Sequence, residues 1–90
     1  MEFDWSAYQT MDVPQEEVAE AFEDAFSLRF LPSSGSAAAQ SRFFCLGKTL
    51  GGRGLFFGYS SNGKSVKVLW ARGMSEEEDF FYQRKLREFL

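Results

Sequence analysis

Three apolar, aromatic-rich runs separated by two glycine turns constrain the fold of this chain more than any other feature. The runs cover about residues 42–47, 54–60 and 65–71, and they have the length and composition of β-strands. The second turn, SSNGK, contains Asn62-Gly63, a pair typical of a type I′ hairpin. Tight turns of this kind join neighbouring antiparallel strands. The sequence therefore predicts a three-stranded antiparallel meander.

The first turn, GKTLGGRG at residues 47–54, is also similar in composition to a phosphate-binding loop. A Walker A loop needs a glycine at the position of Arg42, and a dinucleotide fingerprint needs one at Phe57. Both motifs lead from a strand into a helix, whereas residues 55–59 have the pattern of a second strand. We therefore predict a hairpin turn without nucleotide affinity. Turn geometry does not require an arginine, so Arg53 is kept as a candidate functional residue.

A helix is expected before these strands. Its apolar stripe consists of residues at helical spacing, namely Val18, Ala21, Phe22, Ala25 and Phe26. The stripe predicts a helix over about residues 13–25, with acidic side chains on most of its other faces. Asp12 is expected to cap this helix, with Pro14 in the first turn and Gln15 completing a capping-box spacing.

A second helix is expected at the C-terminal end. Ser75 and Glu78 have the spacing of a capping box and open a helix that runs through Leu90. The residues on its apolar face are Tyr82, Leu86 and Phe89.

Short strands at about residues 2–5 and 27–31, with a flexible loop over 32–41, complete the pattern. No repeat or second domain is visible, so we expect a single domain over residues 1–90. Its class is α+β: one helix from the N-terminal half and the C-terminal helix pack on a small antiparallel sheet.

The chain contains no histidine and one cysteine, Cys45. These counts exclude Ser-His and Cys-His catalysis, an intramolecular disulfide and a cysteine-based zinc site. Cys45 stands in an apolar run and is predicted to be an inert buried thiol. Any chemistry must then use Arg, Lys, Tyr, Glu or Asp, and we expect no cofactor and no metal.

Charge and aromatic content point to partners. The net charge of −3 is uneven, since residues 1–31 carry eight acids and one base whereas residues 32–90 carry nine bases and five acids. A basic surface on an acidic protein still attracts phosphates locally. Sixteen aromatic residues are also more than so small a core is expected to hide. No signal pattern or membrane-length apolar run is present, so we expect a cytoplasmic protein that makes no membrane contact.

Four segments in order resemble the BrnT family of type II toxins: EFDW, VPQEEVAEAFEDAFSLRF, RFFCLGKTLGGRGLFF and KVLWARGMSEEEDFFY. The family pattern has a Phe-x-Trp start, a Glu-Glu-Ala helix ending in Phe, a Gly-x-Thr-x-x-Gly-Arg hairpin and an Ala-Arg-x-Met close followed by Glu and Tyr. The matching positions are Trp5, Thr49, Gly52, Arg53, Ala71, Arg72, Met74, Glu78 and Tyr82. The Asn, Lys, His and Gly stretch that family members carry before the first helix is replaced here by SAYQTMD.

The resemblance implies a RelE-like fold and a ribonuclease that arrests growth. It also implies neutralisation by a BrnA-like antitoxin, so that contact with DNA is made only through the antitoxin. RNA is then the expected substrate, and an antitoxin-like protein is the expected partner.

Metal-free RNA cleavage needs a base, an acid and cations that stabilise the charge on phosphorus. Arg53 and Arg72 are the candidate cations, and we expect both on one basic face of the sheet. Glu78 and Tyr82 are the candidates for proton transfer, although Glu78 also fits a helix cap and Tyr82 a core stripe. Trp70 is either part of the core or a stacking surface for a base.

Two other functions stay open. The first is an inactive relative that works by protein contact or by self-association as a homodimer, which the SAYQTMD segment favours. The second is a small-ligand or nucleic-acid module without catalysis.

Overall fold

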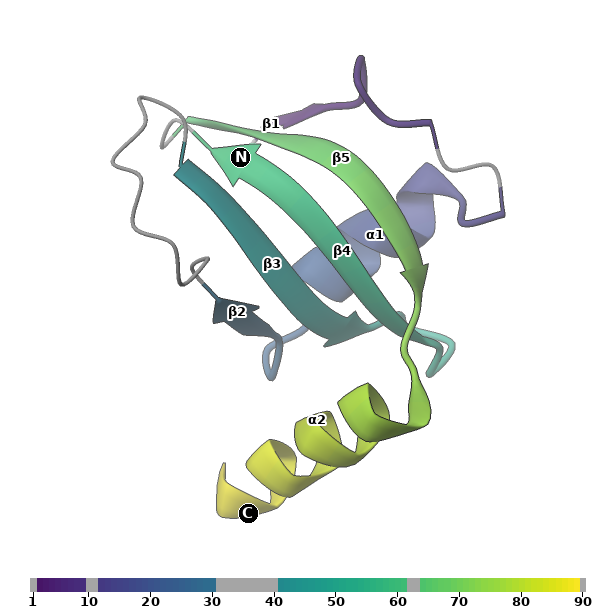
Figure 1. Ribbon diagram of the computed structural model, residues 1–90, viewed down its shortest axis with the longest axis vertical. Helices are drawn as coiled ribbons and strands as arrows, with labels where there is room; N and C mark the ends of the chain where they lie inside the picture. The colour runs from purple at the N-terminus through teal and green to yellow at the C-terminus, as the bar shows by residue number, and fades with distance from the viewer. Residues whose placement is uncertain (1, 10–11, 31–40, 62–63, 90) are drawn as a thin grey trace.

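The computed structural model describes residues 2–9, 12–30, 41–61 and 64–89. Within them a five-stranded sheet combines with two helices, so the predicted α+β class is confirmed (Figure 1). The elements in chain order are β1 (Glu2–Asp4), α1 (Gln15–Phe22), β2 (Leu28–Phe30), β3 (Ser41–Lys48), β4 (Gly54–Ser61), β5 (Ser65–Gly73) and α2 (Glu76–Phe89). Residues 32–40 of the predicted loop and the Asn62-Gly63 turn lie outside the described residues.

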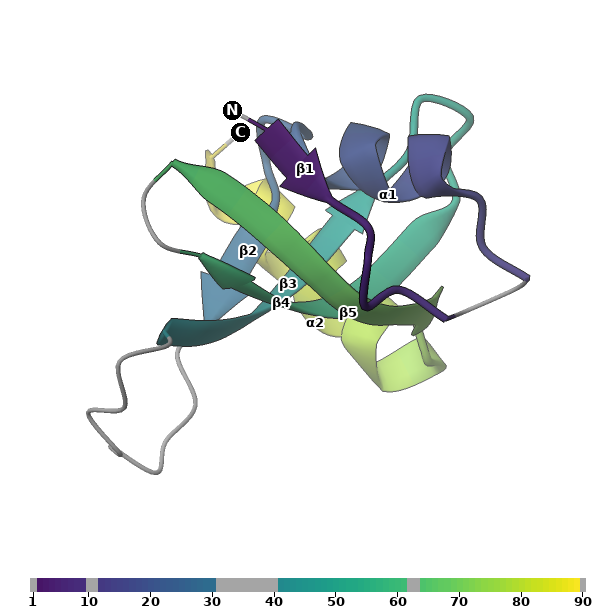
Figure 2. The same cartoon turned by 90° about the horizontal axis from the view of Figure 1, so that it is seen from above.

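The strand order is β1-β5-β4-β3-β2. The pairs β2–β3, β3–β4 and β4–β5 are antiparallel, as the predicted meander requires. Strand β1 instead pairs parallel with β5, with Phe3 opposite Val66, so the prediction of a purely antiparallel sheet is wrong at this edge. The chain passes from β1 through α1, behind the sheet, to β2 at the opposite edge (Figures 1 and 2). Two strands joined by a short turn must run antiparallel. No short turn joins β1 to β5, so this pair is able to run parallel.

Helix α1 is shorter than predicted at both ends. It begins at Gln15, and its N-cap is Pro14, which makes no side-chain cap hydrogen bond. The Pro14 carbonyl accepts the first helical N–H groups, from Glu17 at 3.0 Å and Val18 at 3.3 Å. The predicted Asp12 cap is therefore wrong. Burial of the preceding residue, Val13, fixes the approach to the helix instead.

At the other end, α1 stops at Phe22 because Asp24 binds backbone groups outside the helix. Its carboxylate accepts the N–H of Phe26 at 3.0 Å and the N–H of Lys48, on β3, at 2.9 Å. Asp side chains compete with helical hydrogen bonding in this way. Ala25 and Phe26, predicted to continue the apolar stripe, are consequently exposed.

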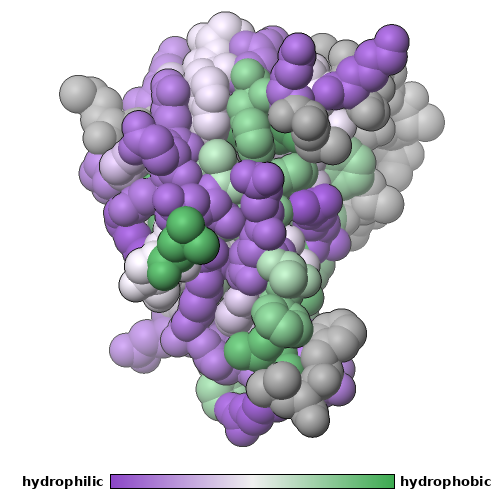
Figure 3. Space-filling view, turned by 180° about the vertical axis from the view of Figure 1, so that it is seen from behind, coloured by the Kyte–Doolittle hydropathy of each residue, from purple (hydrophilic) through white to green (hydrophobic). Residues whose placement is uncertain are grey.

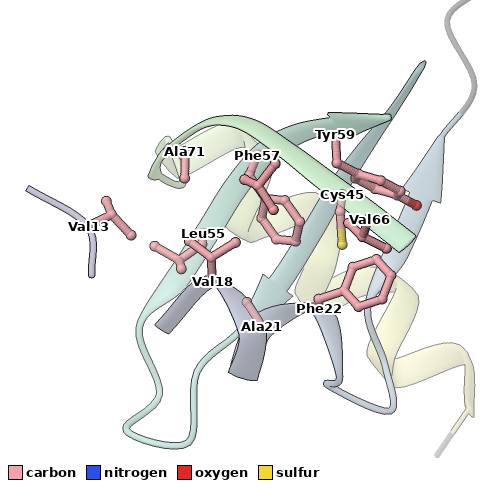
Figure 4. Close-up of a cluster of buried hydrophobic side chains, with 11 residues drawn as sticks. Val13, Val18, Ala21, Phe22, Cys45, Leu55, Phe57, Tyr59, Val66 and Ala71 are labelled. Carbon is pink, nitrogen blue, oxygen red and sulfur yellow. The ribbon is translucent and has the colours of Figure 1, made fainter. Parts of the chain in front are cut away.

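The core lies between α1 and the sheet (Figure 4). Phe22 packs edge-to-face on Tyr59, with ring centroids 5.3 Å apart, and also contacts Phe57. The helix approaches β3 closely at Gly47, where an added Cβ would lie 2.2 Å from the Ala21 carbonyl oxygen. Glycine is therefore required at this position for α1 to pack on the sheet.

The side of β3–β5 turned away from α1 is called here the open face. In Figure 1 no helix crosses in front of these strands, and α2 lies at their lower end. Phe81 of α2 contacts Phe30 of β2, and the α2 residue Tyr82 is buried outside the main core. Neither helix among the described residues is long and apolar enough to cross a membrane.

Candidate functional site

The glycine-rich segment between β3 and β4 forms a hairpin turn, as predicted. The Thr49 N–H donates to the Arg53 carbonyl at 2.9 Å, and the Gly52 N–H donates to the Thr49 carbonyl at 2.9 Å. Gly52 has a φ of 89°, which non-glycine residues rarely adopt. The turn leads from strand to strand, so it lacks the strand-to-helix setting of a phosphate loop. The lack of nucleotide affinity stays a prediction.

Arg53, at the end of this turn, is tied to α1. Its Nη1 lies 2.9 Å from Oε1 of Glu17, and its side chain is 43% exposed. Because α1 packs on the core side of the sheet, Arg53 belongs to that side.

Arg72 lies on the open face. It pairs with Phe56 in the β4–β5 register, and its guanidinium carbon lies 4.7 Å from the Phe56 ring centroid. Phe57, which follows Phe56 on β4, points into the core under α1. Successive strand residues face opposite sides of a sheet, so Phe56 and Arg72 point away from α1. The prediction that Arg53 and Arg72 share one basic face is therefore wrong.

Arg72 and Glu78 form a bidentate ion pair. Nη1 donates to Oε1 at 2.9 Å, and Nη2 donates to Oε2 at 2.7 Å. The hydrogen bond from the Arg72 guanidinium lowers the pKa of Glu78, although partial burial opposes this shift. The same hydrogen bond raises the pKa of Arg72. Both groups are therefore charged at neutral pH, and the Glu78 carboxylate is a weak base.

Glu78 also closes the predicted capping box at the start of α2. The Ser75 N–H donates to Glu78 Oε1 at 2.8 Å, and the Glu78 N–H donates to Ser75 Oγ at 3.2 Å. The structural role considered for Glu78 is thus confirmed, and the same carboxylate positions the Arg72 guanidinium.

Tyr82 is buried, and its hydroxyl donates a short hydrogen bond to Asp24. Burial raises the pKa of Tyr82, and the bond to Asp24 raises it further. Lys48 lies 5.5 Å from the Tyr82 ring centroid and forms an ion pair with Asp79 at 3.4 Å. The tyrosine therefore fastens α2 to the segment after α1, a structural role, although Tyr82 lies outside the main core.

Of the four candidate site residues, only Arg72 and Glu78 are thus brought together on the surface. Arg53 and Tyr82 contact other parts of the fold, each through an acidic partner of its own.

The open face also carries an aromatic cluster, which combines Trp70 with two phenylalanines that the sequence did not single out. Phe44 and Phe56 stack with centroids 5.7 Å apart, and Trp70 lies 5.3 Å from Phe56 and 6.1 Å from Phe44. All three are partly exposed. Trp70 and Arg72 are two residues apart on β5, so strand alternation puts them on the same side of the sheet. The cluster with Phe44 and Phe56 depends in addition on the register between strands.

Charge is distributed unevenly along the chain. The segment from Ala25 to Ser75 contains no acid, and its bases are Arg29, Arg42, Lys48, Arg53, Lys64, Lys67 and Arg72. The acids of the chain lie mainly in and around α1 and in the first turn of α2. Seen from behind, the α1 side is largely hydrophilic, with hydrophobic surface in separate areas, one of them at the lower end (Figure 3).

Cys45 is buried in the core, as predicted. Burial raises the pKa of its thiol to about 12, so the reactive thiolate is not formed at neutral pH. In the described part of the chain, no group of three or more Cys, Asp or Glu residues is arranged to hold a metal ion.

No protein-family model matches the chain, and no curated protein sequence matches it.

Proposed function

We propose that this chain is the toxin component of a type II toxin-antitoxin pair. In this proposal it is a BrnT-like, metal-independent ribonuclease with a RelE-like fold that acts in the cytoplasm. The observation that carries the proposal is the Arg72–Glu78 pair, which lies at the end of the open face and matches the last segment of the resemblance. The four ordered motif segments and the α+β architecture support it as well.

The chemistry centres on Arg72. A planar guanidinium binds phosphate oxygens in a bidentate way, and it stabilises the charge that develops on phosphorus. An RNA phosphate would compete with Glu78 for the same N–H groups. Once displaced, the Glu78 carboxylate would accept the proton of the attacking 2′-hydroxyl as the new P–O bond forms, and the protonated Glu78 would return it to the 5′-oxygen as the bond from phosphorus to that oxygen breaks. Arg53 and Tyr82 then serve the fold rather than the reaction.

An antitoxin-like protein would neutralise this toxin by covering the open face and part of α2. Phe80 of α2 is 62% exposed and offers an apolar contact there. DNA contact would be made by the antitoxin alone.

A second candidate is an inactive relative that acts by protein contact or as a homodimer. Two observations favour it: the Tyr82 hydroxyl is already bound to Asp24, and the lowered pKa of Glu78 makes this carboxylate a weak base.

Two matched arginine variants distinguish these candidates. Arg72 and Arg53 have similar exposure, at 49% and 43%, and each forms an ion pair with a glutamate. We expect induced expression in a bacterial host to arrest growth, Arg72→Ala to relieve the arrest, and Arg53→Ala to leave it in place. Purified protein should cleave RNA in the presence of a chelator, with a loss of about 100-fold or more in Arg72→Ala.

The opposite pattern, in which Arg53→Ala abolishes cleavage and Arg72→Ala does not, would contradict the proposed site. Folded wild-type protein that neither arrests growth nor cleaves RNA would favour the inactive relative.

A further inference from the structure

Phe44, Phe56 and Trp70 lie on three adjacent strands and form what is called here the aromatic platform. Their ring centroids lie within 6.1 Å of one another, and none of the three is fully buried. Large aromatic side chains contribute most when buried, so a partly exposed cluster at the middle of a sheet is a surface available to a ligand.

The backbone around Trp70 places its indole over Gly58 of β4. Tyr59 pairs with Val68 and Gly58 with Trp70, which leaves Leu69 as an extra residue in a β-bulge. Bulges re-aim side chains. The indole then covers Gly58, where an added Cβ would lie 2.8 Å from Nε1 of Trp70.

Two bases lie beside the platform: Arg72, which is ion-paired with Glu78 of α2, and Lys67. Arg72 lies over the Phe56 ring, and Lys67 pairs with Ser60, two residues along β4 from Gly58. The strands β2–β5 contain no acid, and the acidic helix α1 is on the other side of the sheet. Flat rings edged by cations complement a nucleic acid, whose bases stack and whose phosphates are negative.

We propose that the aromatic platform binds single-stranded RNA, with bases stacked on Trp70 and Phe44 and a phosphate held by Arg72. In a duplex the faces of the bases are already stacked on one another, whereas unpaired bases can lie on aromatic side chains. Neighbouring strands are about 4.8 Å apart, so a three-strand platform is wide enough for one or two bases. The inference rests on the proposed action on RNA, and it adds that the substrate is single-stranded.

Binding is tested with a fluorescent single-stranded oligomer of about eight nucleotides, a length within the usual site sizes for such proteins. Its sugars are 2′-O-methylated, so that it cannot be cleaved and anisotropy reports binding alone. We expect Trp70→Leu to weaken binding by about 5- to 150-fold, the range typical of one lost base stack. Trp70→Phe keeps a ring and should retain most of the affinity.

Phe80→Leu is the matched control, because it removes an exposed ring of α2 outside the platform. We expect it to leave affinity unchanged. Gly58→Ala provides an independent variant, since it keeps every aromatic ring but displaces the indole; weaker binding is expected there too. Far-UV circular dichroism tests whether each variant is folded. If Trp70→Leu does not fold, the affinity of Gly58→Ala decides whether the platform binds the oligomer.

Three results would overturn the platform. They are equal affinity in wild type and the folded platform variants, tighter binding of the matching duplex, and a Trp70-dependent dimer in light scattering without oligomer binding. If the wild type arrests growth and Trp70→Leu binds the oligomer as tightly as the wild type does, the platform is rejected and the proposed function is kept. Platform-dependent binding without arrest or cleavage would reject ribonuclease activity and keep the platform.

Discussion

At the residue scale, Asp24 and Tyr82 show how one carboxylate joins distant parts of the chain. The Asp24 side chain accepts hydrogen bonds from the Phe26 N–H, the Lys48 N–H and the Tyr82 hydroxyl. These donors belong to the segment after α1, to β3 and to α2. Tyr82, a candidate catalytic residue, is therefore a structural residue whose hydroxyl proton is hydrogen-bonded to Asp24.

This coupling predicts a loss of stability at alkaline pH. The pKa of Tyr82 is raised above the ordinary tyrosine value of 10.0 in the folded chain, so above pH 10.0 the unfolded chain releases this proton while the folded chain keeps it. The free energy of unfolding then falls as pH rises, by at most about 1.4 kcal/mol per pH unit from this group. Urea unfolding at about pH 8 and about pH 11 should show a smaller alkaline loss in Tyr82→Phe than in wild type. An equal loss in both proteins would disprove the coupling.

At the element scale, α2 depends on its first turn. Glu78 closes the capping box with Ser75 and also holds Arg72 on β5. One side chain thus takes part in the cap at the start of the helix and joins that helix to β5.

Glu78→Ala should lower the free energy of unfolding by about 1 kcal/mol, since it removes the carboxylate that accepts the Ser75 N–H and pairs with Arg72. Glu78→Gln should cost less, because glutamine can still accept the Ser75 N–H. In wild type the contribution of the charge should be lost as pH falls below 4.5, because the pKa of Glu78 is lowered in the folded chain. Urea unfolding measures these changes. Glu77→Ala, an exposed first-turn variant, is the control, and a cost equal to that of Glu78→Ala would argue against the cap.

At the scale of the whole molecule, the net charge of −3 conceals two unlike sides. The acids of α1 lie behind the sheet, and ions screen charges beyond about 10 Å at ordinary salt concentrations. A ligand at the open face is therefore expected to respond to the bases of the strands rather than to the net charge.

Oligonucleotide binding should accordingly weaken as salt rises, despite the acidic pI. Arg72→Ala should reduce the slope of log affinity against log salt by about 0.7, the value for one phosphate contact on a single strand. Glu16→Gln, on the far side, should leave the slope unchanged. Anisotropy titrations across a salt series provide the measurement. Affinity independent of salt would mean that phosphates are not bound at this face.

Local patterns in the sequence determined most elements. Glycine turns between apolar runs, helical spacing in α1 and the Ser75–Glu78 box act over a few residues, and the structure confirms the meander, the hairpin turn and the α2 cap. The sequence did not predict the ends of α1, because they depend on the burial of Val13 in the core and on the bond from the Lys48 N–H of β3 to Asp24.

Tertiary structure alone decided which candidate residues meet. Arg53 and Arg72 look equivalent along the chain, but alternation and register send one toward α1 and the other to the open face. Phe44, Phe56 and Trp70 lie on separate strands, and a bulge at Leu69 brings Trp70 over Gly58 beside the other two. Side-chain direction in a strand reverses with every residue, so the membership of a face depends on register, which is set by packing across the whole sheet.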